Sequence, residues 1–461
     1  MTSAVAAVNL GATSGRVMLG FVSHNVLALR PVARFPNSPV IKPDGLHWDV
    51  SALYEHFRAG LAAAIREEPD LASIGVDSWA VDYGLLRGGE LIAESFHYRD
   101  GRRTRGVAEV EREIPPAELY SRNGLQFLPF NTLYRLADDR MSGRRSNADS
   151  MLLVPDLIEY WLTGHQLAER TNASTTGLLR VADRQWDDEL VARLGLPQSL
   201  FPELVDAGSA IGPLRAPVAN EIGAPSGLGV TGVGSHDTAS AVAGIPATER
   251  DFAYISCGTW SLVGVELEQP VLSEAGRVRY LRKVMGLWLL SEYIRAWEQA
   301  GETIELPLLL DQAAAVSGPA AIFDPDDQHF LAHGGMPDRI AAHCRDHGLL
   351  LGASLAEVVR SIQESLADAY TRTIRQLGYL TGKTIRVIHL VGGGSLNTLL
   401  CQLTSGRTGL PVIAGPVGAT AIGNVLIQAR AIGLVSGDLD TLRGLVARSA
   451  QQVTYSTRWS D

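Results

Sequence analysis

Two short glycine-bearing turns carry the residue types that bind phosphate. The first occupies residues 10–16 (Leu-Gly-Ala-Thr-Ser-Gly-Arg) and the second residues 257–261 (Cys-Gly-Thr-Trp-Ser), and each lies between apolar segments. Small residues let backbone N–H groups approach an anion closely, and Thr or Ser hydroxyls add further donors. One such turn alone would be interpreted as an ordinary hairpin. Two turns with matching chemistry, one in each half of the chain, indicate two arms that close on one polyphosphate.

A third glycine segment suits the remainder of a nucleotide. Residues 385–391 are apolar enough for a buried strand, and Gly392, Gly393 and Gly394 follow before a helical pattern begins. Ligands of open α/β sheets lie beyond the carboxyl ends of strands, where bare glycine backbone lets a flat base or a ribose come close. A tight strand-to-helix turn is the alternative interpretation. The segment has no Walker motif and no G-x-G-x-x-G fingerprint, which disfavours the P-loop and Rossmann folds.

Two carboxylate-bearing segments could act on a hydroxylated substrate. Residues 234–239 (Gly-Ser-His-Asp-Thr-Ala) open a small-residue helix, where Asp237 could accept the proton of an attacking hydroxyl. A lone Asp at a helix start is often only a cap, which is the alternative. Residues 75–83 place two carboxylates and two aromatic rings at a strand end. That combination suits a polyol, and its alternative is a strand edge with a half-buried Trp.

Length and composition limit the classes of protein. The 461 residues exceed what one hydrophobic core usually organises and predict two domains. A net charge of −10 without a dense Lys/Arg run argues against nucleic acid, and no apolar stretch reaches membrane-spanning length. Three widely separated cysteines fit a reducing compartment. We therefore expect a cytoplasmic protein with no nucleic-acid or membrane partner; the oligomeric state is not indicated.

The order of the predicted elements indicates an α/β fold. After the first hairpin, residues 50–66 show helical spacing and residues 71–76 form a short apolar run, which gives the order β-β-α-β. The pattern restarts with the second hairpin. Further strands are expected at residues 151–154, 385–391 and 410–414, and further helices at residues 133–141, 155–162, 287–299, 355–377, from 396, and 419–432. Alternating strands and helices predict sheets covered by helices.

A domain boundary is expected near the middle of the chain. Residues 223–229 are rich in Gly, Pro and Ser and mark the approach to it. The second hairpin follows soon afterwards. We therefore predict an N-terminal domain of residues 1–240 and a C-terminal domain of residues 241–461.

Taken together, these segments resemble the FGGY-type sugar kinases and, within them, the rhamnulokinase branch. The resemblance covers most of the chain. It is carried by residues 9–19 (NLGATSGRVML), 124–134 (GLQFLPFNTLY), 171–176 (TNASTT), 235–242 (SHDTASAV), 256–262 (SCGTWSL), 285–290 (MGLWLL) and 391–397 (VGGGSLN). It implies two ribonuclease-H-like domains of the actin and hexokinase type around a central cleft that holds ATP and a ketose.

The resemblance also implies roles for single residues. Asp237 would take the proton of the sugar hydroxyl, with His236 and Thr238 beside it on the sugar. The same pocket would be lined by Ala80, Asp82, Gln126 and Lys283. The phosphates and the adenosine would be bound by Ala12, Thr13, Ser14, Gly15, Arg16, Thr259, Ser291, Gly393, Gly394 and Asn397. Mg²⁺ would bridge phosphate oxygens and neutralise the charge that develops in the transfer.

The chain departs from the family pattern at several of these positions. Asn9 stands where the family has an Asp associated with the metal, and a neutral amide should hold a hard cation less strongly. Ala80 replaces a Gly near the sugar, and between Ser273 and Leu281 the chain is shorter than in typical members. The remaining exchanges are Lys283 for an Asn at the sugar, Ser291 for a Gln near ATP, and Gly418 for a Glu after Gly-Pro-Val.

The resulting hypothesis is an ATP-dependent ketose kinase that converts L-rhamnulose to L-rhamnulose 1-phosphate. A kinase for another ketose, such as L-fuculose, would differ only in the details of its pocket. A non-catalytic sugar- or nucleotide-binding regulator is the alternative from another class, because Asn9, Gly418 and the short segment at residues 273–281 depart from the family pattern.

Overall fold

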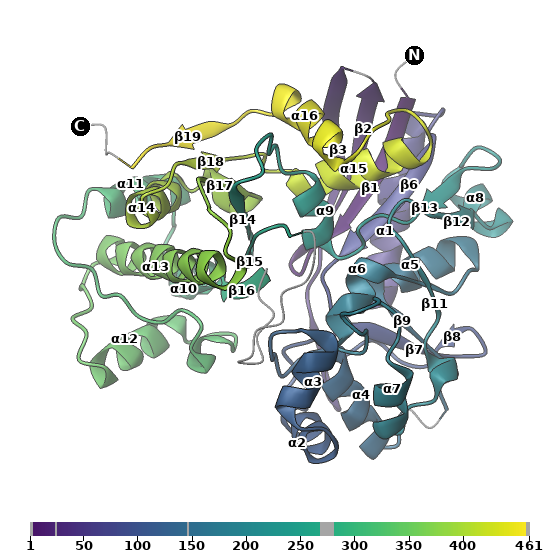
Figure 1. Ribbon diagram of the computed structural model, residues 1–461, viewed down its shortest axis with the longest axis horizontal. Coiled ribbons are helices and arrows are strands. Elements are labelled where there is room, and N and C mark those ends of the chain that lie inside the picture. Colours follow the sequence, from purple (N-terminus) through teal and green to yellow (C-terminus); the bar gives the residue numbers. More distant parts are fainter. Residues whose placement is uncertain (1–2, 24, 145–146, 268–280, 458–461) are drawn as a thin grey trace. The chain divides into compact units, whose positions relative to one another are not determined.

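The computed structural model describes residues 3–23, 25–144, 147–267 and 281–457 (Figure 1). The chain forms two compact units. The first contains Met1–Gly244 and Ala419–Ser449, and the second contains most of the chain from Ile245 to Gly418 together with Ala450–Asp461. Part of the predicted second domain, residues 419–449, thus packs with the first unit. The segment of residues 223–229 lies within the first unit.

The first unit is built on a six-stranded sheet with the order β12-β13-β6-β1-β2-β3. Its strands are β1 (Ser3–Leu10), β2 (Ser14–Ser23), β3 (Val26–Pro36), β6 (Ser73–Ser78), β12 (Ala210–Pro213) and β13 (Gly229–Thr231). The predicted hairpin and the predicted strand after the first helix are confirmed: β1 is antiparallel to β2 and parallel to β6. Parallel pairing places the carboxyl ends of β1 and β6 at the same edge of the sheet.

Helices from both ends of the chain cover this sheet. In α1 (Val50–Glu67) the buried apolar residues recur at helical spacing, and Asp49 caps the first turn by accepting a hydrogen bond from the Ala52 N–H. In Figure 1, α15 (Ala419–Ala431) lies in yellow against the purple strands, and it packs on β1, β2 and β6. Its approach is close, because a Cβ atom added to Gly20 of β2 would lie 2.3 Å from a methyl carbon of Val425. This unit is completed by α16 (Leu439–Ser449).

A helix-rich segment follows the strand β6. A second, smaller sheet has the order β8-β7-β9. The elements of this segment are β7 (Tyr83–Arg87), β8 (Glu90–Leu91), α2 (Arg103–Glu113), α3 (Pro116–Asn123), α4 (Thr132–Met141), β9 (Ser150–Leu153), α5 (Val154–Thr163), β10 (Leu167–Glu169), α6 (Arg170–Ala173), α7 (Asp188–Arg193), β11 (Glu203–Val205) and α8 (Ala216–Ile222). It has its own core, in which Ile114 and Leu136 are fully buried.

The second unit repeats the hairpin and the parallel strand of the first. Its sheet has the order β16-β15-β14-β17-β18-β19. The strands are β14 (Phe252–Cys257), β15 (Trp260–Gly264), β16 (Leu281–Met285), β17 (Val387–Val391), β18 (Val412–Ala414) and β19 (Val453–Tyr455). The hairpin β14-β15 is antiparallel, and β17 runs parallel to β14. The α/β class with two sheet-containing units therefore agrees with the sequence prediction.

The helices of the second unit enclose one large apolar core. They are α10 (Trp288–Gln299), α11 (Leu306–Ala314), α12 (Met336–Asp346), α13 (Leu355–Thr381) and α14 (Thr398–Thr408). The longest, α13, begins with a capping box between Ser354 and Glu357 and ends at Gly382 in the left-handed conformation. Its buried face packs against α11, α14 and the strand β15.

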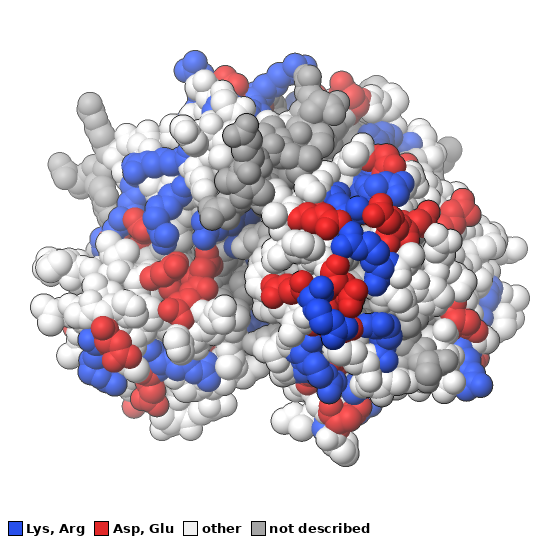
Figure 2. All heavy atoms as spheres, turned by 60° about the horizontal axis from the view of Figure 1, so that its bottom comes forward, with Lys and Arg blue, Asp and Glu red and all other residues white. Residues whose placement is uncertain are grey.

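The described surface carries charges of both signs. On the face that Figure 2 shows, basic and acidic side chains are interspersed. Among the described residues, no helix is both long enough and apolar enough to cross a membrane. All three cysteines are buried as free thiols.

Candidate active site

The predicted catalytic segment of the first unit lies at the edge where β1 and β6 end. Asn9 and Asp77 are register partners across these two strands. The Ser78 N–H donates to the Ser235 carbonyl oxygen over 2.9 Å, and a β-bridge joins Ser78 to His236. The fold therefore brings the start of α9 (Asp237–Ala243) to the strand end that carries Asp77.

Asp77 is fully buried and held by two amides. One of its oxygens accepts a hydrogen bond from Asn9 Nδ2, and the other accepts one from Asn424 Nδ2 over 2.7 Å. Burial raises the pKa of the Asp77 carboxyl well above its usual value, and the nearby Asp237 acts in the same direction. In this hydrogen bond the Asn9 amide presents its NH₂ group to Asp77. Its carbonyl oxygen is then the atom of Asn9 that could bind a cation or a water.

Asp237, the predicted base, is the accessible carboxylate of this edge. Its side chain is 33% exposed, and His236 Nε2 lies 3.6 Å from its Oδ1 atom. The Thr238 hydroxyl donates to the same oxygen over 3.2 Å. A partly exposed carboxylate can contact a bound hydroxyl and accept its proton. A fully buried carboxylate cannot contact that hydroxyl.

The first phosphate turn is rigidly held. Asn37 donates its backbone N–H to the Thr13 carbonyl over 3.1 Å and its Nδ2 to the Gly11 carbonyl over 2.8 Å. Gly15 is required by packing, because an added Cβ would lie 2.0 Å from the Phe35 ring. Exposure is partial at Ala12 and Ser14 and greater at Thr13 and Arg16.

Arg16 stands next to a second cation on this hairpin. Arg16 and Arg34 are register partners on β2 and β3. Partial burial, and then the charge of Arg34, lower the pKa of the Arg16 guanidinium. Two adjacent guanidinium groups favour an anion at this turn.

The predicted sugar segment contains a strained backbone and a buried carboxylate. Val81 has a φ of +70°, a conformation that is a genuine outlier for a β-branched residue. Its carbonyl oxygen accepts from the Thr132 hydroxyl over 2.7 Å, which helps to hold that conformation. Ala80 just before it is half-buried, as is Gln126.

Asp82 lies beneath the surface and organises aromatic side chains. It is fully buried, and its carboxylate accepts hydrogen bonds from the indoles of Trp48 and Trp79 and from the Arg135 guanidinium. The two indole rings contact each other at 4.3 Å between centroids. This carboxylate therefore fixes the aromatic wall next to Ala80, which is a role that the sequence did not indicate.

In the second unit, the corresponding strand ends carry glycine. Gly392 has a φ of +86°, and a Cβ added there would lie 2.8 Å from the Cys257 carbonyl oxygen. A Cβ added to Gly394 would lie 2.2 Å from Cys257 Sγ. A Cβ on Gly393 would meet no described heavy atom within 4 Å, and this residue is exposed. Two glycines thus fit against β14 while the third presents bare backbone, which suits the face of a nucleotide.

The second phosphate turn lies beside these glycines. β14 pairs with β17 up to Ser256 and Val391, and Thr259 follows in the turn of the hairpin as a half-buried residue. Its carbonyl oxygen accepts from the Trp288 N–H over 3.2 Å. Both predicted nucleotide segments of this unit therefore meet at one edge of its sheet.

The remaining predicted residues of this unit have other partners. Asn397 is buried, caps α14 through the Leu400 N–H, and donates to Gln363 over 3.0 Å. The ammonium group of Lys283 lies 4.3 Å from the centroid of the Trp260 ring. Ser291 is exposed on α10, and Gly418 directly precedes α15. Of the shortened segment at residues 273–281, all residues before Leu281 lie outside the described residues.

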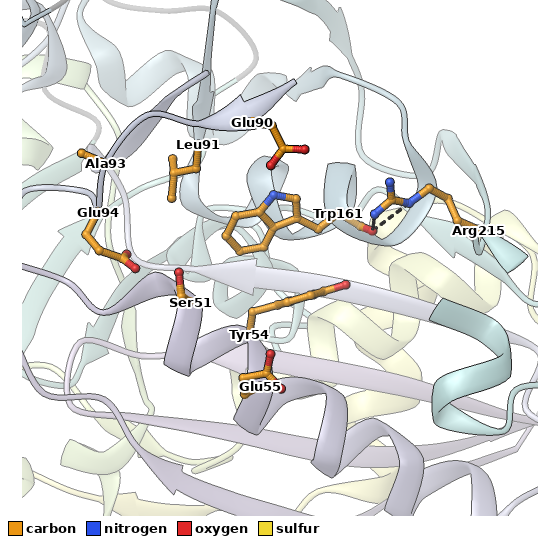
Figure 3. Close-up of a pocket in the computed structure, with 9 residues that line it drawn as sticks. All are labelled: Ser51, Tyr54, Glu55, Glu90, Leu91, Ala93, Glu94, Trp161 and Arg215. Atoms are coloured by element: carbon orange, nitrogen blue, oxygen red, sulfur yellow. Dashed lines mark hydrogen bonds between the residues drawn. The ribbon is translucent and has the colours of Figure 1, made fainter. Parts of the chain in front are cut away.

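A pocket in the first unit lies apart from the predicted residues. It has a volume of about 470 Å³ and lies between α1, β8 and the end of α5 (Figure 3). It is lined by Ser51, Tyr54, Glu55, Glu90, Leu91, Ala93, Glu94, Trp161 and Arg215. These nine residues include none that the sequence assigned to the sugar or the nucleotide.

Sequence reasoning missed several residues that hold the site together. Asn424 and Gln428 lie one turn apart among the buried, mostly apolar residues of α15, and Gln428 donates to Asn424 over 2.6 Å. A polar pair inside an apolar helix was a detectable signal, because buried amides need partners. Sequence reasoning also assigned no role to Glu169, although this residue lies two positions before the family-like segment at residues 171–176.

Known proteins resemble the chain along almost its whole length. The model of the N-terminal domain of the FGGY family of carbohydrate kinases matches residues 5–244, and the model of the C-terminal domain matches residues 253–432. A rhamnulokinase from Pectobacterium carotovorum subsp. carotovorum (strain PC1) is 39% identical over 98% of this chain and 93% of its own length. A rhamnulokinase from Bacteroides thetaiotaomicron is 37% identical over 97% of this chain and 95% of its own length.

Solved structures show the same fold at lower identity. The ligand-bound xylulose kinase from Lactobacillus acidophilus has a TM-score of 0.80 and 18% identity, and covers 99% of this chain and 94% of its own. The Plasmodium falciparum glycerol kinase with ADP has a TM-score of 0.77 and 16% identity, with the same coverage. With both family domains matched in order over most of its residues, the chain belongs to the FGGY family of carbohydrate kinases.

Proposed function

We propose that the protein transfers the γ-phosphoryl group of ATP to the 1-hydroxyl of a ketose, with L-rhamnulose as the substrate. The observation that carries this proposal is the identity of 37–39% to proteins named rhamnulokinase over nearly the whole chain. Asp237, accessible at the strand edge of the first unit, supports the chemistry. The free, buried thiols support a cytoplasmic location.

Asp237 is the proposed general base. The oxygen of the sugar hydroxyl forms a bond to the γ-phosphorus, while the bond from that phosphorus to the β-γ bridging oxygen breaks. The hydroxyl proton passes to the Asp237 carboxylate, and ADP leaves with the bonding electron pair. His236 and Thr238 limit the orientations of this carboxylate, because both lie at its Oδ1 atom.

The turns at Thr13 and Thr259 are the proposed phosphate clamps, and Gly393 is the proposed surface for the adenosine. The open backbone of Gly393 fits a flat ligand. Arg16, with Arg34 as its neighbour, adds positive charge near the proposed position of the phosphates. This charge would stabilise the negative charge on the phosphate oxygens in the transition state.

The donor set fits a magnesium ion that arrives with the nucleotide. Among the described residues, no group of three or more His, Cys, Asp or Glu side chains is arranged to hold a metal ion. Mg²⁺ commonly binds through substrate phosphates, waters and one or two protein oxygens, which Asp237 and the Asn9 amide oxygen could supply. When bound, such an ion neutralises the charge on the phosphates.

A second candidate is a sugar- and nucleotide-binding protein with weakened catalysis. Asn9 favours it, because its amide already donates to Asp77 and brings no charge to the metal. Its prediction is binding of ATP or sugar without turnover.

A coupled assay of ADP release from Mg-ATP tests both candidates. The sugars are L-rhamnulose, L-fuculose, L-ribulose and D-xylulose, and Asp237→Ala is the control. Turnover with L-rhamnulose that the control abolishes supports the proposal. Turnover with another sugar alone would replace the substrate, and binding without turnover would favour the second candidate.

A further inference from the structure

A buried carboxylate stands directly behind the catalytic segment. Glu169, the last residue of β10, is 1% exposed. Its Oε2 atom accepts hydrogen bonds from the Ser235 N–H over 3.0 Å and from the Ser235 hydroxyl over 3.1 Å. Ser235 is two residues before Asp237 and lies in a loop, outside any helix or strand. The Glu169 carboxyl therefore binds the loop that precedes the proposed base through two hydrogen bonds.

The opposite side of Ser235 is also held. Its carbonyl oxygen accepts from the Ser78 N–H at the end of β6, and the Ser240 hydroxyl donates to the Gly234 carbonyl over 2.7 Å. Every backbone hydrogen-bonding group of Ser235 thus has a partner. Glu169 and the sheet edge together fix the point from which α9 begins.

Glu169 makes all these contacts as an acceptor. The Thr171 N–H donates to Oε1 over 3.0 Å, and the Thr171 hydroxyl and the Asn172 N–H donate to Oε2. With the two groups of Ser235, five donors converge on one carboxyl. Burial raises the pKa of the Glu169 carboxyl above its usual value, whereas the hydrogen bonds from Thr171 and Ser235 act in the opposite direction.

Two further buried carboxyls lie next to Glu169 without touching Ser235. Asp156 Oδ1 accepts from the Glu169 N–H over 3.2 Å, and Asp156 Oδ2 and Glu159 Oε1 have no hydrogen-bond partner among the described residues. Burial raises the pKa of Asp156 and of Glu159 well above their usual values, and the proximity of Glu169 adds to both shifts. Burial thus disfavours the ionised form of all three carboxyls, and Glu169 is the one with five hydrogen-bond donors that oppose this effect.

We propose that Glu169 is a positioning residue for phosphoryl transfer, whose carboxylate holds Ser235 and through it sets the place of Asp237. The proposal rests on the proposed function only for its effect on turnover. A base has to be kept within a fraction of an ångström of its working position, and a misplacement of about 1 Å can cost roughly 10²-fold in rate. A buried carboxyl that accepts hydrogen bonds from five donors is suited to that task.

The test compares two Glu→Gln exchanges in the same buried cluster. Glu169→Gln keeps the shape but presents an NH₂ group to donors that need an acceptor. Glu159→Gln makes the same exchange at a buried carboxyl that has no described hydrogen bond to Ser235. We expect kcat to fall about tenfold to a hundredfold in the first variant, with KM for ATP unchanged, and to stay within about twofold in the second.

A double-mutant cycle shows whether the effect passes through Ser235. Ser235→Ala alone should lower kcat about threefold to tenfold, and the double variant should be less impaired than the product of the two single effects. Full kcat in folded Glu169→Gln, equal losses in both Gln variants, or purely multiplicative effects would overturn the proposal. Should Glu169→Gln fail to fold, Ser235→Ala decides, since unchanged kcat there also overturns it.

Hydrogen exchange separates this proposal from the proposed function. Glu169→Gln should speed amide exchange in residues 235–238, and Glu159→Gln should not, whatever sugar the wild-type protein accepts. Unchanged exchange in the first variant contradicts the anchor even in an active kinase. Faster exchange in a protein that turns over no ketose would uphold the anchor and reject the kinase.

Discussion

The edges at which the two sheets present their candidate residues share a topology and differ in chemistry. Each is formed by a hairpin and a parallel strand, β1-β2 with β6 in the first unit and β14-β15 with β17 in the second. The first edge carries the carboxyl groups of Asp77 and Asp237, which can exchange protons, and the amide of Asn9, which forms hydrogen bonds. The second carries Gly392, Gly393 and Gly394, which offer only backbone.

This difference matches the two proposed tasks, proton transfer at the first edge and nucleotide binding at the second. A partly exposed carboxylate beside a buried one creates a charged site that can act on a hydroxyl. A bare glycine backbone gives a surface on which a flat group can lie. Exchanges at the first edge should therefore change kcat or the response to pH, whereas exchanges at the second should change nucleotide affinity or packing.

The largest effect is expected from Asp237→Asn. The amide keeps the size of the side chain but cannot take the hydroxyl proton, so kcat should fall by about 10² to 10⁴. KM for ATP should change much less than kcat, because the proposed phosphate turns at Thr13 and Thr259 and the proposed adenosine surface at Gly393 are left intact. Steady-state kinetics with the best ketose checks both values, and a kcat within tenfold of wild type would reject Asp237 as the base.

The next largest effect is expected from Asn9→Asp, which should lower the free energy of unfolding. It replaces an amide donor to Asp77 by a second carboxyl, and unfolding in urea at pH 8 should become easier by about 3 kcal/mol. The buried carboxyls keep a proton that the unfolded chain loses above its ordinary pKa, so stability falls as pH rises from about 4 toward the raised pKa.

The loss caused by Asn9→Asp should accordingly be smaller at pH 5 than at pH 8. Asn9→Ala is the control, because it removes the hydrogen bond without adding a charge, and it should cost about 1 kcal/mol. Equal losses at the two pH values in Asn9→Asp would show that no carboxyl pair forms.

Two neighbouring glycines of the second edge should respond differently. Gly394→Ala drives a methyl group into Cys257 and should destabilise the protein by about 2 kcal/mol. Gly393→Ala has room for its methyl group and should leave Tm unchanged, while raising KM for ATP if the nucleotide lies there. Thermal melts and ATP titrations distinguish the two, and an unchanged KM in Gly393→Ala would remove the adenosine from this residue.

The smallest effect is expected at Asn397. Asn397→Ala removes the cap of α14 and should lower stability by about 1 kcal/mol. Asn397→Asp keeps the capping oxygen and loses only the donor to Gln363, so it should cost less. If both variants instead raise KM for ATP with unchanged Tm, Asn397 contacts the nucleotide as the family resemblance implies.

Local patterns in the sequence were sufficient for most elements. The predicted helix at residues 50–66 is α1 (Val50–Glu67), and the predicted helix at residues 287–299 is α10 (Trp288–Gln299). Periodicity of apolar residues fixes such elements because each buries one face. The predicted strand at residues 385–391 is shorter in the structure, where β17 begins at Val387.

Contacts between distant segments could not be predicted in this way. The hydrogen bond from Asn424 to Asp77 joins residues 347 positions apart, and the one from Ser235 to Glu169 joins residues 66 positions apart. No local period encodes such pairs, because the partner is set by the tertiary fold. The pattern of residues 75–83 shows the same limit, since it could not reveal that Trp48 and Arg135 surround the Asp82 carboxylate. The contact of Asp82 with the sugar stays a prediction.

The return of α15 to the first sheet has a consequence for the order of folding during synthesis. The N-terminal part of the first unit ends at Gly244, but the helix that supplies Asn424 is complete only at Ala431. At translation rates of about 5–20 residues per second, the ribosome needs roughly 10–40 s to make the segment between these two points. Throughout that interval β1 and β6 lack one of their covers and Asp77 lacks an amide partner. The first unit therefore reaches its final form only after nearly the last helix of the chain has been made.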